Sequence, residues 1–231
     1  MPEDPRFTTP LYTISEGARY LKVPASTFAT WAHGYRRQAP GRREVVGEAI
    51  LTTVAAAPGQ PEVPFVGLVE GMVAASFRRA GVSMQHIRRA LEVIRKEIGL
   101  NHALASKRLY TDGASILYDY ASRTEDEEIL AAVVTGQRSF RPLIQDYLRM
   151  ITYASDKWAT KLVLPITDRP VVLVDPSRAF GSPVFIRGGA RMEDVLGRFA
   201  AGEPLGSVAQ DFGLSAEDVE AVIRAALPPA A

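Results

Sequence analysis

The sequence predicts a mainly helical α+β fold. Several segments carry apolar residues at the three- and four-residue spacing of an amphipathic helix. Shorter segments rich in valine, isoleucine and leucine have the composition of strands. Proline-rich stretches at residues 58–64 and 165–170 divide the chain. We therefore expect three domains, at residues 1–64, 65–165 and 166–231.

The first domain is predicted to be a winged helix-turn-helix. Ser15 can cap a first short helix, and Pro24 stands where a second helix would place an N-terminal proline. The second helix has an apolar stripe at helical spacing, formed by Phe28, Trp31 and Ala32. Gly34 ends this helix, and residues 45–54 have the composition of the strand that would complete a wing.

The second domain is predicted to be a helical hairpin with a small β-sheet. A helix from Phe65 to Arg79 stops at Gly81, and a second helix begins after a capping Ser83. The apolar seam of this second helix consists of Met84, Ile87, Leu91, Ile94 and Ile98. Further along we expect a hairpin at 107–120 that turns at Asp112-Gly113, strands at 129–134 and 161–164, and a helix near 140–151.

The third domain is predicted to be a small three-helix domain that follows a strand at 171–174 and a turn-rich stretch at 181–189. The three helices have apolar stripes, and their limits are marked by Gly202, by Gly213 and by a capping box at Ser215 and Asp218. We expect them to begin near Met192, Leu205 and Ser215.

The composition is that of a soluble globular protein, with 47% hydrophobic and 23% charged residues among 231. There is no cysteine, which excludes disulfide scaffolds, thiolate nucleophiles and sulfur-ligated metal sites. No apolar run is long enough to cross a bilayer, and the first residues do not form a signal peptide. We therefore expect a cytoplasmic protein without a membrane partner.

Two stretches have the pattern of a helix-turn-helix, residues 13–33 and 205–223, and charge distinguishes them. From Arg19 to Arg43 there are six basic residues and no carboxylate, whereas Arg191 to Arg224 has three arginines against seven carboxylates, a net charge of −4. DNA is a dense polyanion, so a helix that enters a groove needs cations beside it. The N-terminal stretch is the predicted DNA reader, and the C-terminal one is predicted to bind a protein or a second copy of the chain.

The residues expected to bind DNA lie on the outer face of the second helix and in the loop after it. Small hydroxyl side chains suit close contacts with bases or phosphates, and arginines suit the backbone or minor groove. These candidates are Ser26, Thr27, Thr30, His33, Arg36, Arg37, Arg42 and Arg43. The alternative is that the two helices only bury Leu21, Phe28 and Trp31, and that the cations form a solvated face.

The segments from Tyr12 to Pro24 and from Trp31 to Gly34 resemble the MerR-like winged helix-turn-helix of a class of VapB-type antitoxins. The likeness continues at residues 68–70, 77–83 and 87–90. Residues 181–188 and 205–227 are similar to a small domain of unknown function that recurs in toxin–antitoxin operons. The resemblance implies an antitoxin that neutralises a PIN-domain ribonuclease toxin of the VapC type and represses its own operon by binding operator DNA.

PIN nucleases hold Mg²⁺ or Mn²⁺ with a cluster of carboxylates, and the resemblance implies that an arginine of the antitoxin blocks this site. Our candidates are Arg187 and Arg191 on the Gly188-Gly189 turn, with Phe185 beside them. They can equally be ordinary surface residues. Because operators are symmetric, we expect a homodimer or a larger toxin–antitoxin assembly.

The sequence gives little support to an enzyme or to a cofactor. The three histidines are far apart, and the Gly188-Gly189 pair lacks the spacing of a phosphate-binding loop. We expect no metal, no cofactor and no catalytic residue, although a catalytic protein remains a third possibility. The second is a MerR-like one-component regulator in which the seam from Met84 to Ile98 lines a pocket for a small molecule.

Overall fold

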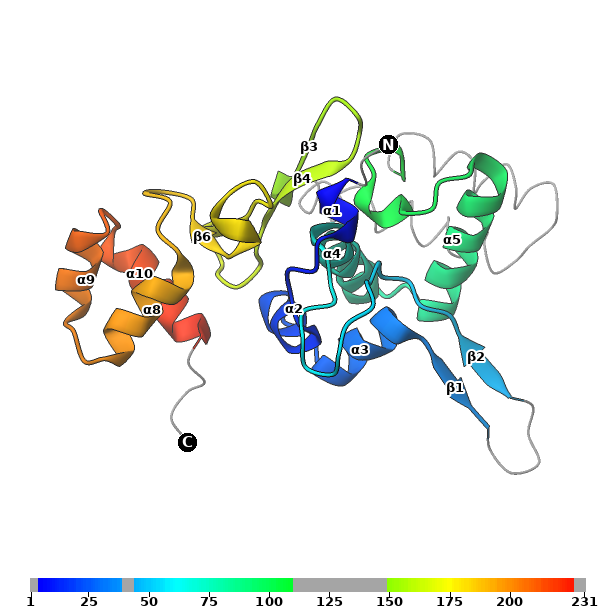
Figure 1. The fold of residues 1–231 in the computed structure, drawn as a ribbon, viewed down its shortest axis with the longest axis horizontal. Helices are drawn as coiled ribbons and strands as arrows, with labels where there is room; N and C mark the ends of the chain where they lie inside the picture. Colours follow the sequence, from blue (N-terminus) through cyan, green and yellow to red (C-terminus); the bar gives the residue numbers. More distant parts are fainter. Residues whose placement is uncertain (1–3, 39–43, 110–148, 227–231) are drawn as a thin grey trace.

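The computed structural model describes residues 4–38, 44–109 and 149–226, and the fold is α+β and mainly helical, as predicted (Figure 1). The expected turn at Asp112-Gly113, the strand at 129–134 and most of the helix near 140–151 lie outside the described residues. In the described part of the chain, no helix is both long and apolar enough to cross a membrane.

The N-terminal unit is built around two helices and a turn that lie against a long central helix. Its elements in chain order are α1 (Pro5–Thr8), α2 (Ile14–Tyr20), α3 (Ala25–His33), β1 (Tyr35–Arg37), β2 (Val45–Gly47), α4 (Phe65–Arg79), α5 (Met84–Ile98) and η1 (Ala103–Ala105). Figure 1 shows the antiparallel pair of β1 and β2 projecting away from the helices as a wing. The strand expected at 45–54 is thus much shorter, because the chain leaves the hairpin after Gly47.

Helix α2 begins two residues earlier than the sequence predicted. Thr13, and not Ser15, is its N-cap: the Thr13 hydroxyl accepts a hydrogen bond from the backbone N–H of Glu16 at 3.2 Å. The Glu16 carboxylate in turn accepts from the backbone N–H of Thr13 at 2.8 Å. This capping box satisfies two N–H groups that a helix start leaves open, which one serine at position 15 would not do.

Phe28 is the centre of the helix-turn-helix core. Its ring is fully buried, and two glycines leave room for it: a Cβ on Gly17 of α2 would lie 2.7 Å from the ring, and one on Gly71 of α4 would lie 2.6 Å from it. Helix α4 therefore packs directly on α2 and α3. The domain limit expected between residues 64 and 65 falls in front of a helix that belongs to the same packed unit.

A four-stranded antiparallel sheet connects the two ends of the molecule. Its strands, in spatial and chain order, are β3 (Ile151–Tyr153), β4 (Ala159–Val163), β5 (Val172–Val174) and β6 (Val184–Phe185). Leu162 of β4 faces Val174 of β5, and Val172 faces Phe185 of β6. The domain limit expected after residue 165 falls between β4 and β5, inside this sheet.

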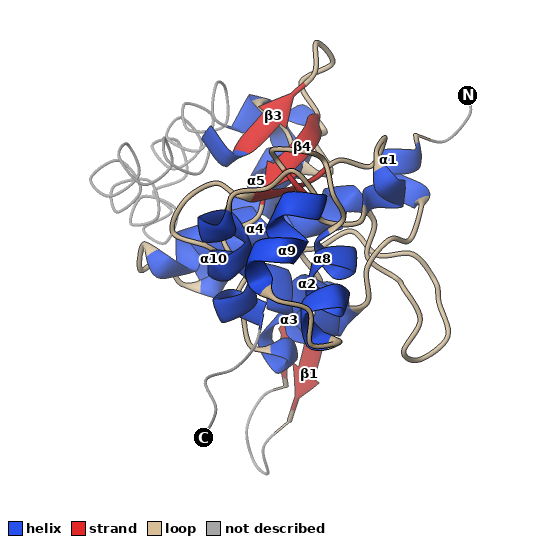
Figure 2. Cartoon of the chain, turned by 90° about the vertical axis from the view of Figure 1, so that its left-hand side faces the viewer, coloured by secondary structure: helices blue, strands red, loops and turns tan. Residues whose placement is uncertain are grey.

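Three helices end the described chain: α8 (Met192–Ala200), α9 (Leu205–Asp211) and α10 (Ala216–Ala226). Their starts agree with the glycine and capping signals of the sequence. Val195, Val208 and Val222 are fully buried between them. Figure 1 places this group at the opposite end of the molecule from the wing, and Figure 2 shows the three helices gathered in front of the other elements.

Two contacts tie the N-terminal unit to the sheet region. The guanidinium group of Arg6 binds the carboxylates of Asp4 at 2.6 Å and of Asp156 at 2.5 Å. These hydrogen bonds lower the pKa of both aspartates. The Tyr12 hydroxyl donates to the carbonyl oxygen of Gly181 at 2.8 Å, and burial raises the pKa of Tyr12 far above its usual range. The tyrosine hydroxyl is therefore held as a neutral donor.

Candidate functional site

Helix α3 presents a small polar face on the side opposite Phe28. Ser26 is exposed and Thr27 and Thr30 are half-buried, so the three side chains leave a shallow surface without long side chains. The Thr30 hydroxyl donates to the carbonyl oxygen of Ser26 at 2.8 Å, which leaves its lone pairs free to accept. Such a surface permits the close approach that a groove-reading helix requires.

His33 ends this face, and the structure gives it a partner that sequence reasoning missed. Its Nε2 lies 2.7 Å from the Glu62 carboxylate. The backbone N–H of Glu62 donates to the carbonyl of Tyr12 at 3.0 Å, and this pairing brings the carboxylate to the end of α3. His33 is thus held by a carboxylate, and we expect it to position the end of α3 and to contribute less to DNA contact than predicted.

The wing begins at a point that only glycine allows. Gly34 has a φ of 71°, and a Cβ there would lie 2.5 Å from the carbonyl oxygen of Gly47. On the first wing strand the Arg36 side chain is 75% exposed, and the Glu44 carboxylate lies 3.8 Å from its guanidinium group. This exposure leaves the Arg36 guanidinium available to a phosphate. The structure places Arg37 on β1, while Arg42 and Arg43 lie outside the described residues.

Arg88 of α5 anchors the base of the wing. Its Nε donates to the carbonyl oxygen of Glu48 at 2.8 Å, and its guanidinium lies over the Tyr35 ring at 5.3 Å from the ring centre. This side chain connects α5 with the first strand of the hairpin and with the residue that follows the second. The contacts join residues 40 or more positions apart, so no local sequence signal indicates them.

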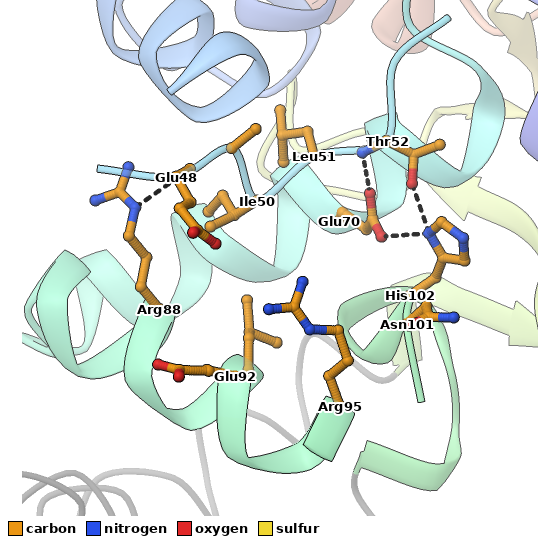
Figure 3. Close-up of a pocket in the computed structure, with 12 residues that line it drawn as sticks. Glu48, Ile50, Leu51, Thr52, Glu70, Arg88, Glu92, Arg95, Asn101 and His102 are labelled. Carbon is orange, nitrogen blue, oxygen red and sulfur yellow. Dashed lines mark hydrogen bonds and ion pairs between the residues drawn. The ribbon is translucent and has the colours of Figure 1, made fainter. Parts of the chain in front are cut away.

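A polar pocket of about 190 Å³ lies beside this anchor, between residues 48–52 and α5. Figure 3 shows Arg88, Glu92 and Arg95 of α5 along its rim and Glu70 of α4 at its inner end. The Glu70 carboxylate is buried and accepts from the backbone N–H of Thr52 at 2.5 Å. It also lies 3.4 Å from Nδ1 of His102. The buried carboxylate is thus already paired, which makes the inner end of the pocket a structural contact.

The C-terminal candidates separate in the structure. Residues 186–189 form a tight turn that is closed by a hydrogen bond from the Phe185 N–H to the carbonyl of Ala190, and Arg187 is exposed on it. Arg191 follows the turn and pairs with the Glu193 carboxylate at 3.0 Å. Phe185 is 1% exposed, because β6 packs its ring into the core. The Phe185 ring is therefore not accessible at the surface of the folded chain, and its contact with the toxin stays a prediction.

The acidic surface of α9 and α10 is partly neutralised by arginines. Arg198 binds the carboxylates of Glu203 and Asp211, and this contact lowers the pKa of Glu203. Arg169 reaches Glu217 at 3.0 Å and Asp218 at 3.4 Å. Glu217 and Asp218, in the first turn of α10, would face phosphates if this helix entered a groove, so the C-terminal helices are poorly suited to DNA.

Among the described residues there is no group of three or more histidine or carboxylate side chains that could hold a metal ion. The remaining histidine, His86, lies in the first turn of α5, where its backbone N–H donates to the Ser83 cap. The candidate binding surfaces in the described chain are the α3 face with the wing at one end and the turn at 186–189 at the other.

Comparison with known proteins gives matches to both ends and to the whole length. The family described as "Putative DNA-binding HTH domain" matches residues 10–91, and the family described as "Protein of unknown function (DUF433)" matches residues 172–225. The chain is 40% identical over 228 residues to "Putative antitoxin VapB45" of Mycobacterium tuberculosis, a match that covers 95% of each. The crystal structure of Rv2018 from Mycobacterium tuberculosis is 37% identical with a TM-score of 0.76, and the match covers 94% of this chain and 99% of that one.

Proposed function

The chain belongs to the antitoxin family that includes VapB45 of Mycobacterium tuberculosis, and we propose that it neutralises a PIN-domain ribonuclease toxin and represses its own operon by binding DNA. The observation that carries the DNA half of this proposal is the small polar face of α3 beside a projecting wing. The domain match over residues 10–91 supports the same assignment.

In the proposed complex, α3 lies in the major groove and the wing follows the DNA backbone. Ser26, Thr27 and Thr30 contact the groove at close range, and Arg36, with the other wing arginines, contacts phosphates. A homodimer would place two such units on a symmetric operator. Arg88 would fix the angle of the wing through Glu48 and Tyr35 without touching DNA.

The toxin half of the proposal rests on the turn at 186–189. Arg187 is exposed there and, within the described residues, has no carboxylate partner, so its guanidinium is available for the metal-binding carboxylates of a PIN nuclease. Arg191 would first have to leave Glu193. We therefore place Arg187 in the nuclease site and Arg191 at its edge.

The DNA half is tested by a gel-shift series on the upstream region of its own operon at increasing salt. The double substitution of Arg36 and Arg37 to alanine should weaken binding and reduce the salt slope by up to about 2, because each lost phosphate contact removes about 0.9 from it. Arg198→Ala, which removes an arginine engaged by Glu203 and Asp211, is the matched control and should leave binding unchanged. An unaltered salt slope in the double variant would exclude the wing arginines.

The toxin half is tested by co-expression with the neighbouring reading frame, followed by purification of the complex and an RNA-cleavage assay. We expect the neighbouring gene to encode a PIN-domain protein that co-purifies and whose cleavage of RNA the chain suppresses. A chain that has no such neighbour, or that leaves RNA cleavage unchanged, would remove this half of the proposal while leaving the DNA half intact.

The second candidate function is a MerR-like regulator that senses a small molecule, and the pocket in Figure 3 is the observation that favours it. Arg88 lies on the rim of this pocket and also holds the wing, so a ligand there could alter the wing and with it DNA affinity. A chain without a toxin gene beside it, whose operator binding changes with a metabolite, would favour this function.

A further inference from the structure

Phe180 is the most exposed large apolar side chain among the described residues, at 95% exposure. The next ones, Val46 and Ile186, are 50% and 41% exposed. A lone exposed apolar residue is common on protein surfaces and by itself needs no explanation. The backbone that carries Phe180 distinguishes it from such a residue.

That backbone is held in the left-handed region at three consecutive positions. The φ angles are 47° at Ala179, 52° at Phe180 and 75° at Gly181. Residues with a Cβ adopt this region at a cost in free energy, and such strain persists only where the surrounding structure imposes it. An exposed aromatic ring is thus carried on a strained backbone at Ala179 and Phe180.

Several contacts hold the segment in this shape. The backbone N–H groups of Gly181 and Ser182 donate to the carbonyls of Arg178 at 2.9 Å and of Ala179 at 3.0 Å. The buried hydroxyl of Tyr12 donates to the Gly181 carbonyl at 2.8 Å, and a Cβ on Gly181 would lie 2.6 Å from the Leu11 side chain. The ring of Phe180 is therefore carried on a preformed support, which reduces the entropy that a partner would have to offset.

Two exposed arginines belong to the loop of Phe180 and to the turn beside it. Arg178, two residues earlier, is exposed and points toward the turn that carries Arg187: one of its terminal nitrogens lies 2.9 Å from the position of a Cβ on Gly189. Neither Arg178 nor Arg187 has a carboxylate partner among the described residues. The loop with Phe180 and the turn with Arg187 are thus neighbours. The loop contributes the guanidinium group of Arg178, and the turn contributes that of Arg187.

We propose that Phe180 is the aromatic anchor of the toxin-binding surface and that Arg178 and Arg187 flank it. This combination fits a protein partner with an apolar pocket bordered by carboxylates, because buried aromatic rings and arginines dominate the energetics of protein interfaces. The proposal rests on the toxin half of the proposed function, in which the partner carries a cluster of metal-binding carboxylates. In this proposal the aromatic contact with the toxin comes from Phe180, which a partner can reach, and not from the buried Phe185.

Phe180→Asn tests the proposal, because asparagine tolerates the left-handed conformation while it removes the ring. The affinity of the full chain for the separately purified PIN-domain protein of its operon, measured by isothermal titration, should fall by about 30-fold or more, as expected for a hot-spot aromatic. The thermal midpoint of the variant should equal or exceed that of the wild type, which separates lost binding from lost folding.

Val46→Asn is the matched control, since it removes a half-exposed apolar side chain from the wing and should leave toxin affinity unchanged. If Phe180→Asn binds the toxin as tightly as the wild type, the anchor is wrong and the proposed function stands. If instead Phe180→Asn changes the mass of the chain alone in light scattering, the ring belongs to an interface between copies, and this proposal fails. A wild-type chain that does not bind the nuclease would overturn the anchor together with the toxin half of the proposed function.

Discussion

Gly17→Ala tests the close contact that sets the position of the DNA-facing helix. The new Cβ would lie 2.7 Å from the Phe28 ring, about 0.7 Å short of the 3.4 Å at which ordinary contact begins. The ring cannot simply move away from α2, because the site of a Cβ on Gly71 lies only 2.6 Å from the ring on the side of α4. Helix α3 must therefore shift to relieve the overlap.

Overpacking of this kind costs about 1–3 kcal/mol, while replacing a glycine inside a helix with alanine stabilises by about 0.5–1 kcal/mol. The net effect of Gly17→Ala is a loss of up to about 2.5 kcal/mol. For a chain of this size 1 kcal/mol shifts the thermal midpoint by about 2–4 °C, so we expect the midpoint to fall by up to about 10 °C. The shift of α3 should also weaken operator binding.

Gly197→Ala is the matched control, since Gly197 lies inside α8 and a Cβ there would meet nothing within 4 Å. Only the helix-propensity gain remains, and the midpoint should rise by about 1–4 °C. The two variants are compared by thermal unfolding followed by circular dichroism and by gel shift. Our account of the α2–α3 contact is refuted if Gly17→Ala is as stable as Gly197→Ala and binds the operator like the wild type.

Two further predictions concern ion pairs and free arginines. Arg187→Ala should weaken inhibition of RNA cleavage by about 30-fold or more, as expected when a charged side chain is lost from an interface. Arg191→Ala should weaken it by less, because Glu193 already binds Arg191. Equal effects of the two variants would contradict this ranking. Arg6→Leu should lower stability above pH 4 by at most about 1 kcal/mol, because its ion pairs with Asp4 and Asp156 are partly exposed. Since Arg6 lowers the pKa of both aspartates from 3.8, the stability they contribute is present above that value and lost as the pH falls through the lowered pKa. Urea unfolding between pH 2 and 7 should show the difference between wild type and variant shrinking at the acid end, and a constant difference would argue against the linkage.

The apolar stripe of α3 shows how much of the fold is local. Phe28, Trp31 and Ala32 were predicted to be buried from their spacing, and all three are. The limits of α4, α5 and the three C-terminal helices were likewise close to the predicted ones. Periodicity, caps and glycine stops involve residues within a few positions of each other, so the sequence contains their full cause.

The burial of the two phenylalanines near the turn at 186–189 could not be predicted from the sequence. Phe185 and Phe180 have similar turn-rich surroundings in the sequence, and nothing local says which ring is buried. The pairing of Phe185 with Val172 of β5 turns the first ring inward, while the left-handed segment at 179–181 turns the second outward. Burial here depends on strand register and on the Tyr12 contact, 169 positions away from Gly181.

The charge pattern by itself predicted that the N-terminal end of this chain suits DNA and that the C-terminal end does not, because this pattern depends only on how many charged residues each continuous segment contains. Which cations remain free was decided only by the tertiary structure. Glu62 reaches His33 and Glu48 offers its carbonyl to Arg88 through contacts that span 29 and 40 positions. Ion pairing requires atoms to lie within a few ångströms, and for residues this far apart in the chain only the packing of the helices and the sheet establishes that distance.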